Sequence, residues 1–203
     1  MRKTVLITGC SSGIGLATAK MFAAKDWNVV AAARNPRSLG DWSLMANVLP
    51  LHLDVTDEAS IQEAISAAIA RFGTIDVLVN NAGDEAQFRT NVLGPAAMIR
   101  RVLPLMRKRK SGTIVNVSTV SGGVSASESA LRAHGIRVKL VESAESASDP
   151  KEVAQAIFNA ATDESARLRY PVGGWFRFAM RTILLKQSRA SAQGTRHLSV
   201  VSK

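Results

Sequence analysis

The sequence predicts a doubly wound α/β domain with a parallel sheet. Short apolar runs alternate with longer amphipathic segments along most of the 203 residues, and a glycine-rich turn joins the first apolar run to the first helical segment. Right-handed crossovers make the strands of such alternating units parallel. We expect one domain over residues 1–187, with the strand order 3-2-1-4-5-6-7, and a mobile tail over residues 188–203.

The glycine-rich turn has the sequence TGCSSGIG, from Thr8 to Gly15. It follows an expected strand over residues 4–7 and precedes an expected helix over residues 16–22. Glycine lets a diphosphate approach the backbone, and the N–H groups of the helix N-terminus favour an anion. The turn therefore predicts a nucleotide phosphate site, and a tight turn without a ligand is the alternative. For Cys10 we expect the role of a small turn residue, with a reactive thiol as the alternative.

The later elements follow from the same periodicities. Expected strands cover residues 27–33, 48–53, 75–80, 113–117, 136–141 and 169–172. Expected helices cover residues 38–46, the segment after Asp57, residues 91–109 and the segment after Asp149. Pro50 favours an edge position for the third strand. Thr56 or Asp57 is expected to cap the helix that follows them, and Asp149 to cap the last helix.

The long helix over residues 91–109 is apolar along much of its length. Six of its side chains are expected to face the core: Val92, Ala96, Ile99, Val102, Leu103 and Met106.

The second strand ends at Arg34, and no acidic residue lies between residues 27 and 40. In dinucleotide-binding sheets the end of this strand lies beside the adenosine ribose. An acidic residue there would bind the 2′-hydroxyl, whereas an arginine suits a 2′-phosphate. The sequence therefore favours NADP(H) over NAD(H), and an exposed loop cation is the alternative for Arg34.

Composition restricts the class of protein. Hydrophobic residues make up 46% of the chain, and the single cysteine excludes an internal disulfide and fits a reducing compartment. No window approaches the ~20 apolar residues of a membrane-spanning helix, so we expect a cytoplasmic protein without a membrane span. The net charge is +10, but the basic residues are scattered except at residues 107–110, which end a helix. We expect no nucleic-acid partner and no metal site.

The chain resembles the short-chain dehydrogenase/reductase family from residue 4 to about residue 172. The resemblance depends on five motifs in order: TGCSSGIG at Thr8, LDVTD at Leu53, NNAG at Asn80, TNVLG at Thr90 and GTIVNVSTVSG at Gly112. It implies a Rossmann-like fold and an NADP(H)-dependent oxidoreductase that interconverts an alcohol and a ketone or aldehyde by hydride transfer. It also suggests an apolar substrate and a homodimer or homotetramer.

The resemblance implies roles for individual residues. The cofactor phosphates would lie against Gly9, Ser11, Ser12, Gly13, Ile14 and Gly15. The adenosine half would lie against Asp54, Val55, Asn81, Ala82 and Gly83. Asn91 would hold a water molecule of a proton relay. The hydroxyl of Thr119, or of Ser118 just before it, would polarise the substrate carbonyl.

One feature of the family is missing. The family carries a Tyr-x-x-x-Lys pair after the fifth strand, in which the tyrosine is the general acid/base and the lysine lowers its pKa. Nothing between residues 122 and 136 matches it, and Tyr170 is the single tyrosine of the chain. The loops after Gly83 and Ser143 are also shorter than in the family. All three shortenings border the expected cleft.

We therefore hypothesise that this sequence omits cleft segments of a longer enzyme. An intact mass of 21.7 kDa would contradict that hypothesis. The alternative is a dinucleotide-binding sensor or scaffold that performs no redox step.

Overall fold

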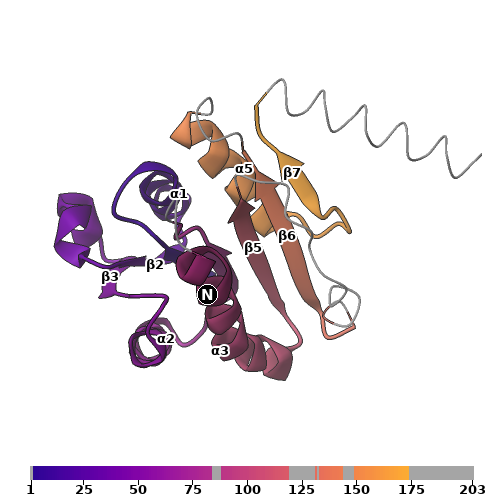
Figure 1. The fold of residues 1–203 in the computed structure, drawn as a ribbon, viewed down its shortest axis with the longest axis horizontal. Coiled ribbons are helices and arrows are strands. Elements are labelled where there is room, and N and C mark those ends of the chain that lie inside the picture. The colour runs from indigo at the N-terminus through magenta and orange to yellow at the C-terminus, as the bar shows by residue number, and fades with distance from the viewer. Residues whose placement is uncertain (1, 84–87, 119–130, 132, 144–148, 174–203) are drawn as a thin grey trace, which may run out of the picture.

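A seven-stranded parallel sheet forms the centre of the computed structural model, which describes residues 2–83, 88–118, 131, 133–143 and 149–173 (Figure 1). The strands are β1 (Thr4–Thr8), β2 (Asn28–Ala33), β3 (Val48–His52), β4 (Val77–Asn80), β5 (Gly112–Ser118), β6 (Ile136–Glu142) and β7 (Arg169–Pro171). Their order is β3-β2-β1-β4-β5-β6-β7, which confirms the predicted order. The expected tail over residues 188–203 lies outside the described residues.

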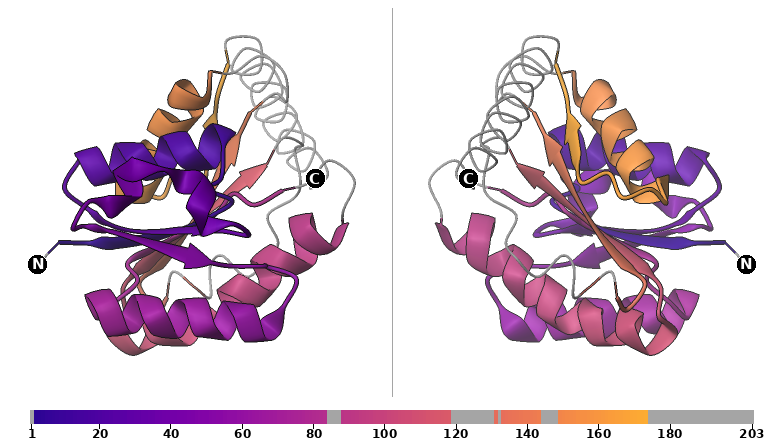
Figure 2. Two further views of the ribbon diagram at one scale, coloured as in Figure 1. Left: turned by 90° about the vertical axis from the view of Figure 1, so that its left-hand side faces the viewer. Right: turned by 90° about the vertical axis from the view of Figure 1, so that its right-hand side faces the viewer.

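Helices cover both faces of this sheet (Figure 2). The α-helices are α1 (Gly13–Ala24), α2 (Glu58–Phe72), α3 (Gly94–Arg109) and α5 (Pro150–Thr162). α1 and α5 pack on one face around Phe22, Val79 and Ile157, and α2 and α3 pack on the other around Leu78, Ile61 and Met98. Because both faces are covered, the central strands are almost continuously apolar. In the described part of the chain, no helix is long and apolar enough to cross a membrane.

The structure confirms the predicted caps of two helices and the predicted edge position of the third strand. Asp57 caps α2, and its carboxylate accepts a hydrogen bond from the Ala59 N–H at 3.0 Å. Asp149 caps α5 in the same way, accepting from the Lys151 N–H at 2.9 Å. β3, which contains Pro50, lies at one edge of the sheet, as expected from the missing backbone donor of proline.

Residues 38–46 do not form the expected helix. The chain forms two short 3₁₀ helices instead, η1 (Pro36–Leu39) and η2 (Asp41–Leu44). Gly40 separates them with a φ of +74°, a left-handed conformation that interrupts a right-handed helix.

The long helix also differs from the prediction. It begins as a π-helical turn, η3 (Arg89–Leu93), and continues as α3. The side chains buried against the sheet are those of Met98, Val102 and Met106, whereas Val92 is 48% exposed and Ala96 is also exposed.

The inward orientation predicted for Val92 and Ala96 is therefore wrong, and Gly94 explains why. A Cβ on Gly94 would lie 2.7 Å from Cγ2 of Val55, so only this side of the helix can approach the β3–α2 loop closely. The close packing of Gly94 against Val55 therefore determines which apolar side of the helix faces the sheet.

Candidate functional site

The predicted nucleotide-binding residues surround one pocket at the carboxyl ends of β1, β2 and β4. Its volume is about 410 Å³. Every predicted cofactor-binding residue except Gly13 lines it: Gly9, Ser11, Ser12, Ile14, Gly15, Arg34, Asp54, Val55, Asn81, Ala82 and Gly83. Thr90 of η3 and Ala33, Leu53 and Thr56 complete the lining. This position, next to β1 where the strand order reverses, is where open α/β sheets bind ligands.

The glycines of the first turn have two different physical roles. A Cβ on Gly15 would lie 2.1 Å from the carbonyl oxygen of Gly9, so Gly15 lets the first turn of α1 pack against the end of β1. Gly13 has a φ of +55° and nothing within 4 Å of its Cβ position, so the backbone there faces open space. The side chain of Ser12, the N-cap residue of α1, forms no capping hydrogen bond within the described part of the chain, and the first turn of α1 contains no acidic residue, which suits an anion at this end.

Thr8 and Asn81 hold the two loops of the pocket together. The Thr8 hydroxyl oxygen accepts hydrogen bonds from the N–H groups of Asn81 at 3.0 Å and Ala82 at 2.9 Å. The Asn81 amide in turn donates to the carbonyl oxygens of Thr8 at 3.1 Å and Gly9 at 3.3 Å. The spacing between the β1 and β4 loops is therefore set by side chains at the site itself.

Arg34 and Asp54 lie at the same end of the pocket. Arg34 is exposed at the end of β2, and its charge acts on the Asp54 carboxylate. The pKa of Asp54 lies below its usual value, chiefly because the Thr56 N–H and hydroxyl both donate to this carboxylate at 2.8 Å. Asp54 is therefore held ionised and oriented, as an acceptor for a ligand amino group requires.

Cys10 is a structural residue of the turn. Its side chain is fully buried, and its thiol donates to the Ile7 carbonyl oxygen at 3.2 Å. Burial raises the pKa of the thiol to about 12. A reactive cysteine needs thiolate character and access to solvent, and Cys10 has neither.

The expected reaction residues lie elsewhere. Asn91 is on η3, with its Oδ1 3.5 Å from the Cβ position of Gly83. Ser118 ends β5, and its carbonyl oxygen accepts a hydrogen bond from the Ser143 N–H at 3.2 Å. Neither residue is in the pocket lining. Thr119 lies outside the described residues.

Glu142 was not singled out from the sequence, yet it is next to Ser118 in the β5–β6 pairing. It is 1% exposed and forms an ion pair with Arg169 of β7, and its Oε2 has no hydrogen-bond partner among the described residues. An acidic residue directly after the expected strand over residues 136–141 was the available signal. Its register opposite Ser118 could be known only from the structure.

Tyr170 is buried in the cluster under α1 and α5 and does not line the pocket. Its hydroxyl accepts a hydrogen bond from the buried Lys139 ammonium at 3.3 Å and donates one to Asp163. Burial and the Asp163 carboxylate raise the pKa of Tyr170 above its usual value. A tyrosine that acts as general acid/base needs the opposite shift, so this pair does not replace the missing Tyr-x-x-x-Lys.

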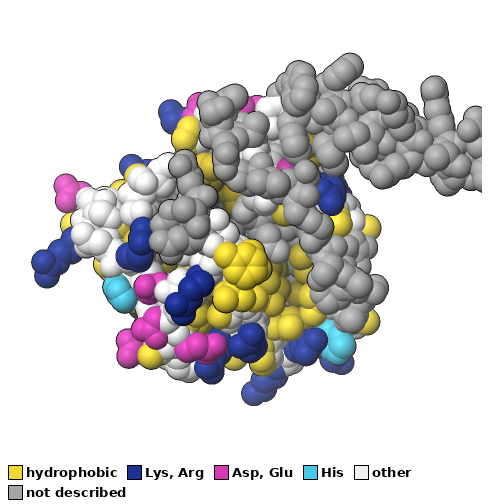
Figure 3. Space-filling view, viewed as in Figure 1, with side chains coloured by type: hydrophobic (Ala, Val, Ile, Leu, Met, Phe, Trp, Pro, Cys, Tyr) yellow, Lys and Arg dark blue, Asp and Glu magenta, His cyan; other side chains and the backbone are white. Residues whose placement is uncertain are grey.

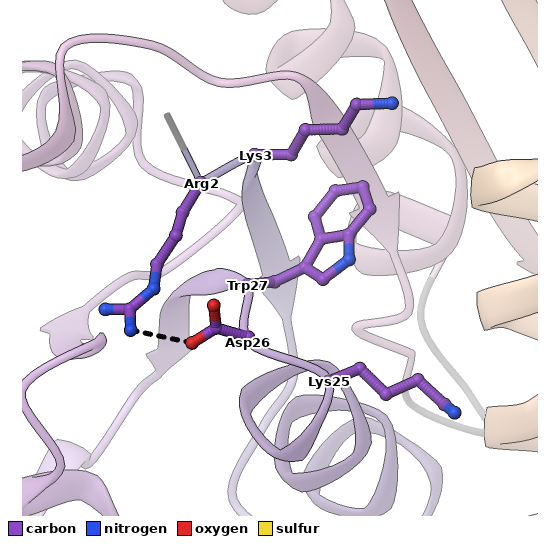
Figure 4. Close-up of a pocket in the computed structure, with 5 residues that line it drawn as sticks. All are labelled: Arg2, Lys3, Lys25, Asp26 and Trp27. Carbon is purple, nitrogen blue, oxygen red and sulfur yellow. Dashed lines mark ion pairs between the residues drawn. The ribbon is translucent and has the colours of Figure 1, made fainter.

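A second hollow, of about 670 Å³, lies near the amino end of β1, away from the predicted residues. Arg2, Lys3, Lys25, Asp26 and Trp27 line it (Figure 4). Arg2 is paired with Asp26 at 2.7 Å, and the Lys3 ammonium lies 5.8 Å from the Trp27 ring centroid. Its lining includes none of the residues that the motifs indicate.

Comparison with known proteins agrees with this geometry. Residues 3–132 match the family model for short chain dehydrogenases. A Schizosaccharomyces pombe protein named as an uncharacterized oxidoreductase is 29% identical over 209 residues, covering 70% of this chain and 89% of that protein. A second S. pombe protein, named NADP-dependent 3-hydroxy acid dehydrogenase, is 39% identical over 142 residues; the match covers 59% of this chain and only 55% of that protein.

A solved structure shows the same fold. The short-chain dehydrogenase from Streptomyces avermitilis superposes with a TM-score of 0.79 and 27% identity, covering all of this chain and 99% of that one. Sequence, sheet order and position of the pocket thus agree with one another. The chain belongs to the short-chain dehydrogenase family, as an enzyme of the oxidoreductase class.

Proposed function

We propose that the chain binds NADP(H) in the pocket at β1, β2 and β4, and interconverts an alcohol and a ketone or aldehyde. The observation that carries this proposal is the convergence of the predicted residues, from four separate segments of the sequence, around one pocket. The name of the S. pombe NADP-dependent 3-hydroxy acid dehydrogenase, a 39% identical relative, supports the choice of NADP. We include in the proposal an apolar substrate, a homodimer or homotetramer and a cytoplasmic location, which the family resemblance and the single cysteine favour.

The residues present fit such a cofactor. The backbone at Gly13 faces open space, and the uncapped N-terminus of α1 offers N–H groups to a pyrophosphate. Arg34 would pair with the 2′-phosphate of the adenosine ribose, and Asp54 would accept a hydrogen bond from the adenine amino group. Asn81, Ala82 and Gly83 would form the wall along the rest of the nucleotide.

When bound, the nicotinamide supplies or accepts the hydride. On the protein side, the hydroxyl of Ser118 or Thr119 would donate a hydrogen bond to the substrate oxygen, and Asn91 would hold a water molecule that relays protons. A proton donor of the family type requires a tyrosine that this sequence does not carry at the expected place.

The alignment with the first S. pombe relative supports the hypothesis of omitted segments. It extends over 209 residues while covering only 70% of this 203-residue chain, so the relative carries residues that have no counterpart here.

Calorimetric titration with NADPH and with NADH tests the binding step. Saturable binding with tighter affinity for NADPH is expected, and absence of saturation with both nucleotides on a folded sample would refute the proposal. Oxidation of NADPH with a panel of apolar ketones and aldehydes, followed at the nicotinamide absorbance, tests the reaction.

A second candidate function is a dinucleotide-binding sensor or scaffold. The observation that favours it is the placement of Tyr170, which is engaged with Lys139 and Asp163 in the core. Saturable NADPH binding without turnover, in a protein whose intact mass is 21.7 kDa, would support this function over the first.

A further inference from the structure

His52 ends β3 at the border of the nucleotide pocket. Its side chain is exposed, whereas the next residues of the chain, 53–55, line the pocket. The strand register pairs His52 with Ala33, and the Leu53 N–H donates to the Ala33 carbonyl oxygen at 3.0 Å. Arg34 directly follows Ala33. This histidine and this arginine therefore lie at the ends of neighbouring strands, at the same edge of the sheet.

Ser60 of α2 links the histidine ring to the pocket lining. The Asp54 N–H donates to the Ser60 hydroxyl oxygen at 3.0 Å, and that oxygen lies 3.4 Å from Nδ1 of His52. The hydroxyl can donate to Nδ1 of a neutral imidazole or accept from the Nδ1–H of an imidazolium, so the contact suits both charge states. The ring is therefore held through Nδ1, and Nε2 lies at its opposite edge.

The charge of His52 acts on the end of the pocket where the adenosine half is expected. Two hydrogen bonds from Thr56 have the largest effect in lowering the pKa of the Asp54 carboxyl, and the positive charges of Arg34 and His52 lower it further. In Figure 3, histidine surface lies over β3, with acidic surface beside it and basic surface close by. The field of His52 therefore reaches a residue that lines the pocket.

Other charged residues belong to the elements packed against β3. They are Arg37 of η1, Asp41 of η2, Asp57 at the start of α2, and Glu58, Glu63 and Arg71 within it. Glu58 is paired with Arg100 and Arg101 of α3. None of these residues lines the pocket, whose charged lining residues in the described part of the chain are Arg34 and Asp54. His52 is thus the histidine that adjoins this charged pair.

We propose that protonation of His52 strengthens the preference of the pocket for NADP(H) over NAD(H). The inference rests on the proposed function, because it concerns the nucleotide that this pocket would bind. The two nucleotides differ by a phosphate monoester, which carries about 1.5–2 negative charges at neutral pH. Arg34 supplies a permanent positive charge, whereas histidine side chains gain or lose theirs between about pH 5 and 8. Because neighbouring strands lie about 4.8 Å apart, a phosphate bound at Arg34 is within the ~10 Å Debye length of His52.

Calorimetric titration of the full chain with NADPH and NADH, at about pH 6 and about pH 8, tests the proposal. His52→Gln should raise the Kd for NADPH about two- to fivefold at the lower pH, the effect of one exposed ion pair, and leave it unchanged at the higher pH. The Kd for NADH should stay the same at both. Since the 2′-phosphate itself titrates near a pH of about 6, variant and wild type are compared at the same pH.

Two further variants separate charge from shape and from position. His52→Lys carries its charge at both pH values, so its Kd for NADPH should lie below that of His52→Gln by the same factor at both. His134→Gln removes an exposed histidine that precedes β6, at the amino edge of the sheet, and should bind like the wild type. Circular dichroism verifies that all three variants are folded.

Three results would overturn the proposal. The first is an effect of His52→Gln that is the same at both pH values, and the second is an equal effect on NADPH and NADH. The third is an effect of His134→Gln as large as that of His52→Gln. Each of these leaves the proposed function standing if the wild type binds NADPH, whereas a wild type that saturates with neither nucleotide would refute the proposed function and this inference with it.

Discussion

The carboxyl edge of the sheet has two halves that differ in how they are built. At β1, β2 and β4, a pocket of about 410 Å³ is lined by nearly all the residues that the nucleotide motifs indicate. At β5, β6 and β7, Ser118 lies beside the ion pair of the buried Glu142 with the partly exposed Arg169, and the family's Tyr-x-x-x-Lys is missing from the sequence. In the proposed function, the first half would bind the nucleotide and the second would carry the proton transfer.

The difference has a physical origin. The first half uses backbone groups, glycines and short polar side chains that consecutive residues supply, so a contiguous motif carries most of it. The second half depends on the side chains of residues far apart in the sequence, such as Ser118 and Glu142. If the hypothesis of omitted segments holds, the omission leaves the first half intact and the second incomplete.

Gly15→Ala should have the largest effect on stability and on NADPH binding, because it disrupts the glycine turn of the first half. The new Cβ would meet the Gly9 carbonyl oxygen at 2.1 Å and the Asn81 amide nitrogen at 2.6 Å. We expect a loss of about 3 kcal/mol in the free energy of unfolding, measured with urea, and loss of detectable NADPH binding. The control Gly13→Ala has no neighbour within 4 Å and should cost only about 1 kcal/mol, for its φ of +55°. Equal losses for both variants would contradict this reading of the turn.

Arg34→Ala tests whether the first half recognises the 2′-phosphate through this arginine. Loss of a charge-assisted contact of about 1.5–3 kcal/mol should raise the Kd for NADPH roughly 10- to 150-fold and leave the Kd for NADH unchanged. Arg37→Ala removes a nearby exposed cation that does not line the pocket, and it should change neither constant. Calorimetry measures both constants, and an equal loss for both nucleotides would show that Arg34 does not recognise the 2′-phosphate.

Tyr170→Phe tests whether the second half uses the single tyrosine. The variant loses the hydroxyl that joins Lys139 to Asp163, so unfolding should become easier by about 1–2 kcal/mol. Any NADPH oxidation by the wild type should persist at the same rate per folded molecule. Abolished turnover in a folded variant would instead make Tyr170 part of the reaction.

The pH dependence of stability tests whether the Tyr170 hydroxyl stabilises the folded protein. Its pKa is raised in the folded state, so its contribution is fully present below the ordinary tyrosine pKa of about 10 and is lost as pH rises through the folded value. The wild type should therefore lose more stability than Tyr170→Phe above that pH. Parallel stability curves for the two proteins would contradict the assigned cause.

Thr56→Val should have the smallest effect. It removes one of the two hydrogen bonds that lower the pKa of Asp54, so that pKa should rise toward its usual value. A lowered pKa stabilises the fold above the unfolded-state value and loses this effect as pH falls through the folded one. The variant should thus lose the contribution at a higher pH than the wild type. Carbon-13 NMR of the Asp54 carboxyl measures the shift, and Thr162→Val, which alters a hydroxyl on α5, should leave it unchanged.

Features that a few consecutive residues encode were predicted correctly, whereas a feature that depends on contact between distant residues was not. The glycine turn, the Asp149 cap and the strand alternation are signals within a few consecutive residues, and the structure agrees with all three. The orientation of α3 was predicted wrongly, because Val92 and Ala96 are as apolar as the residues that are buried. Only the close approach of Gly94 to Val55 selects the side that faces the sheet.

The strand order, the family and the residues around the pocket at β1, β2 and β4 could all be predicted from the sequence, since contiguous motifs and hydrophobic periodicity are local properties of the chain. Tertiary structure alone decided that Glu142 lies beside Ser118, that Tyr170 is held in the core by Lys139, and that Ser60 links His52 to Asp54. Those features arise from register and packing between distant segments, because the free energy of burial depends on which surfaces meet, and no short stretch of sequence specifies that.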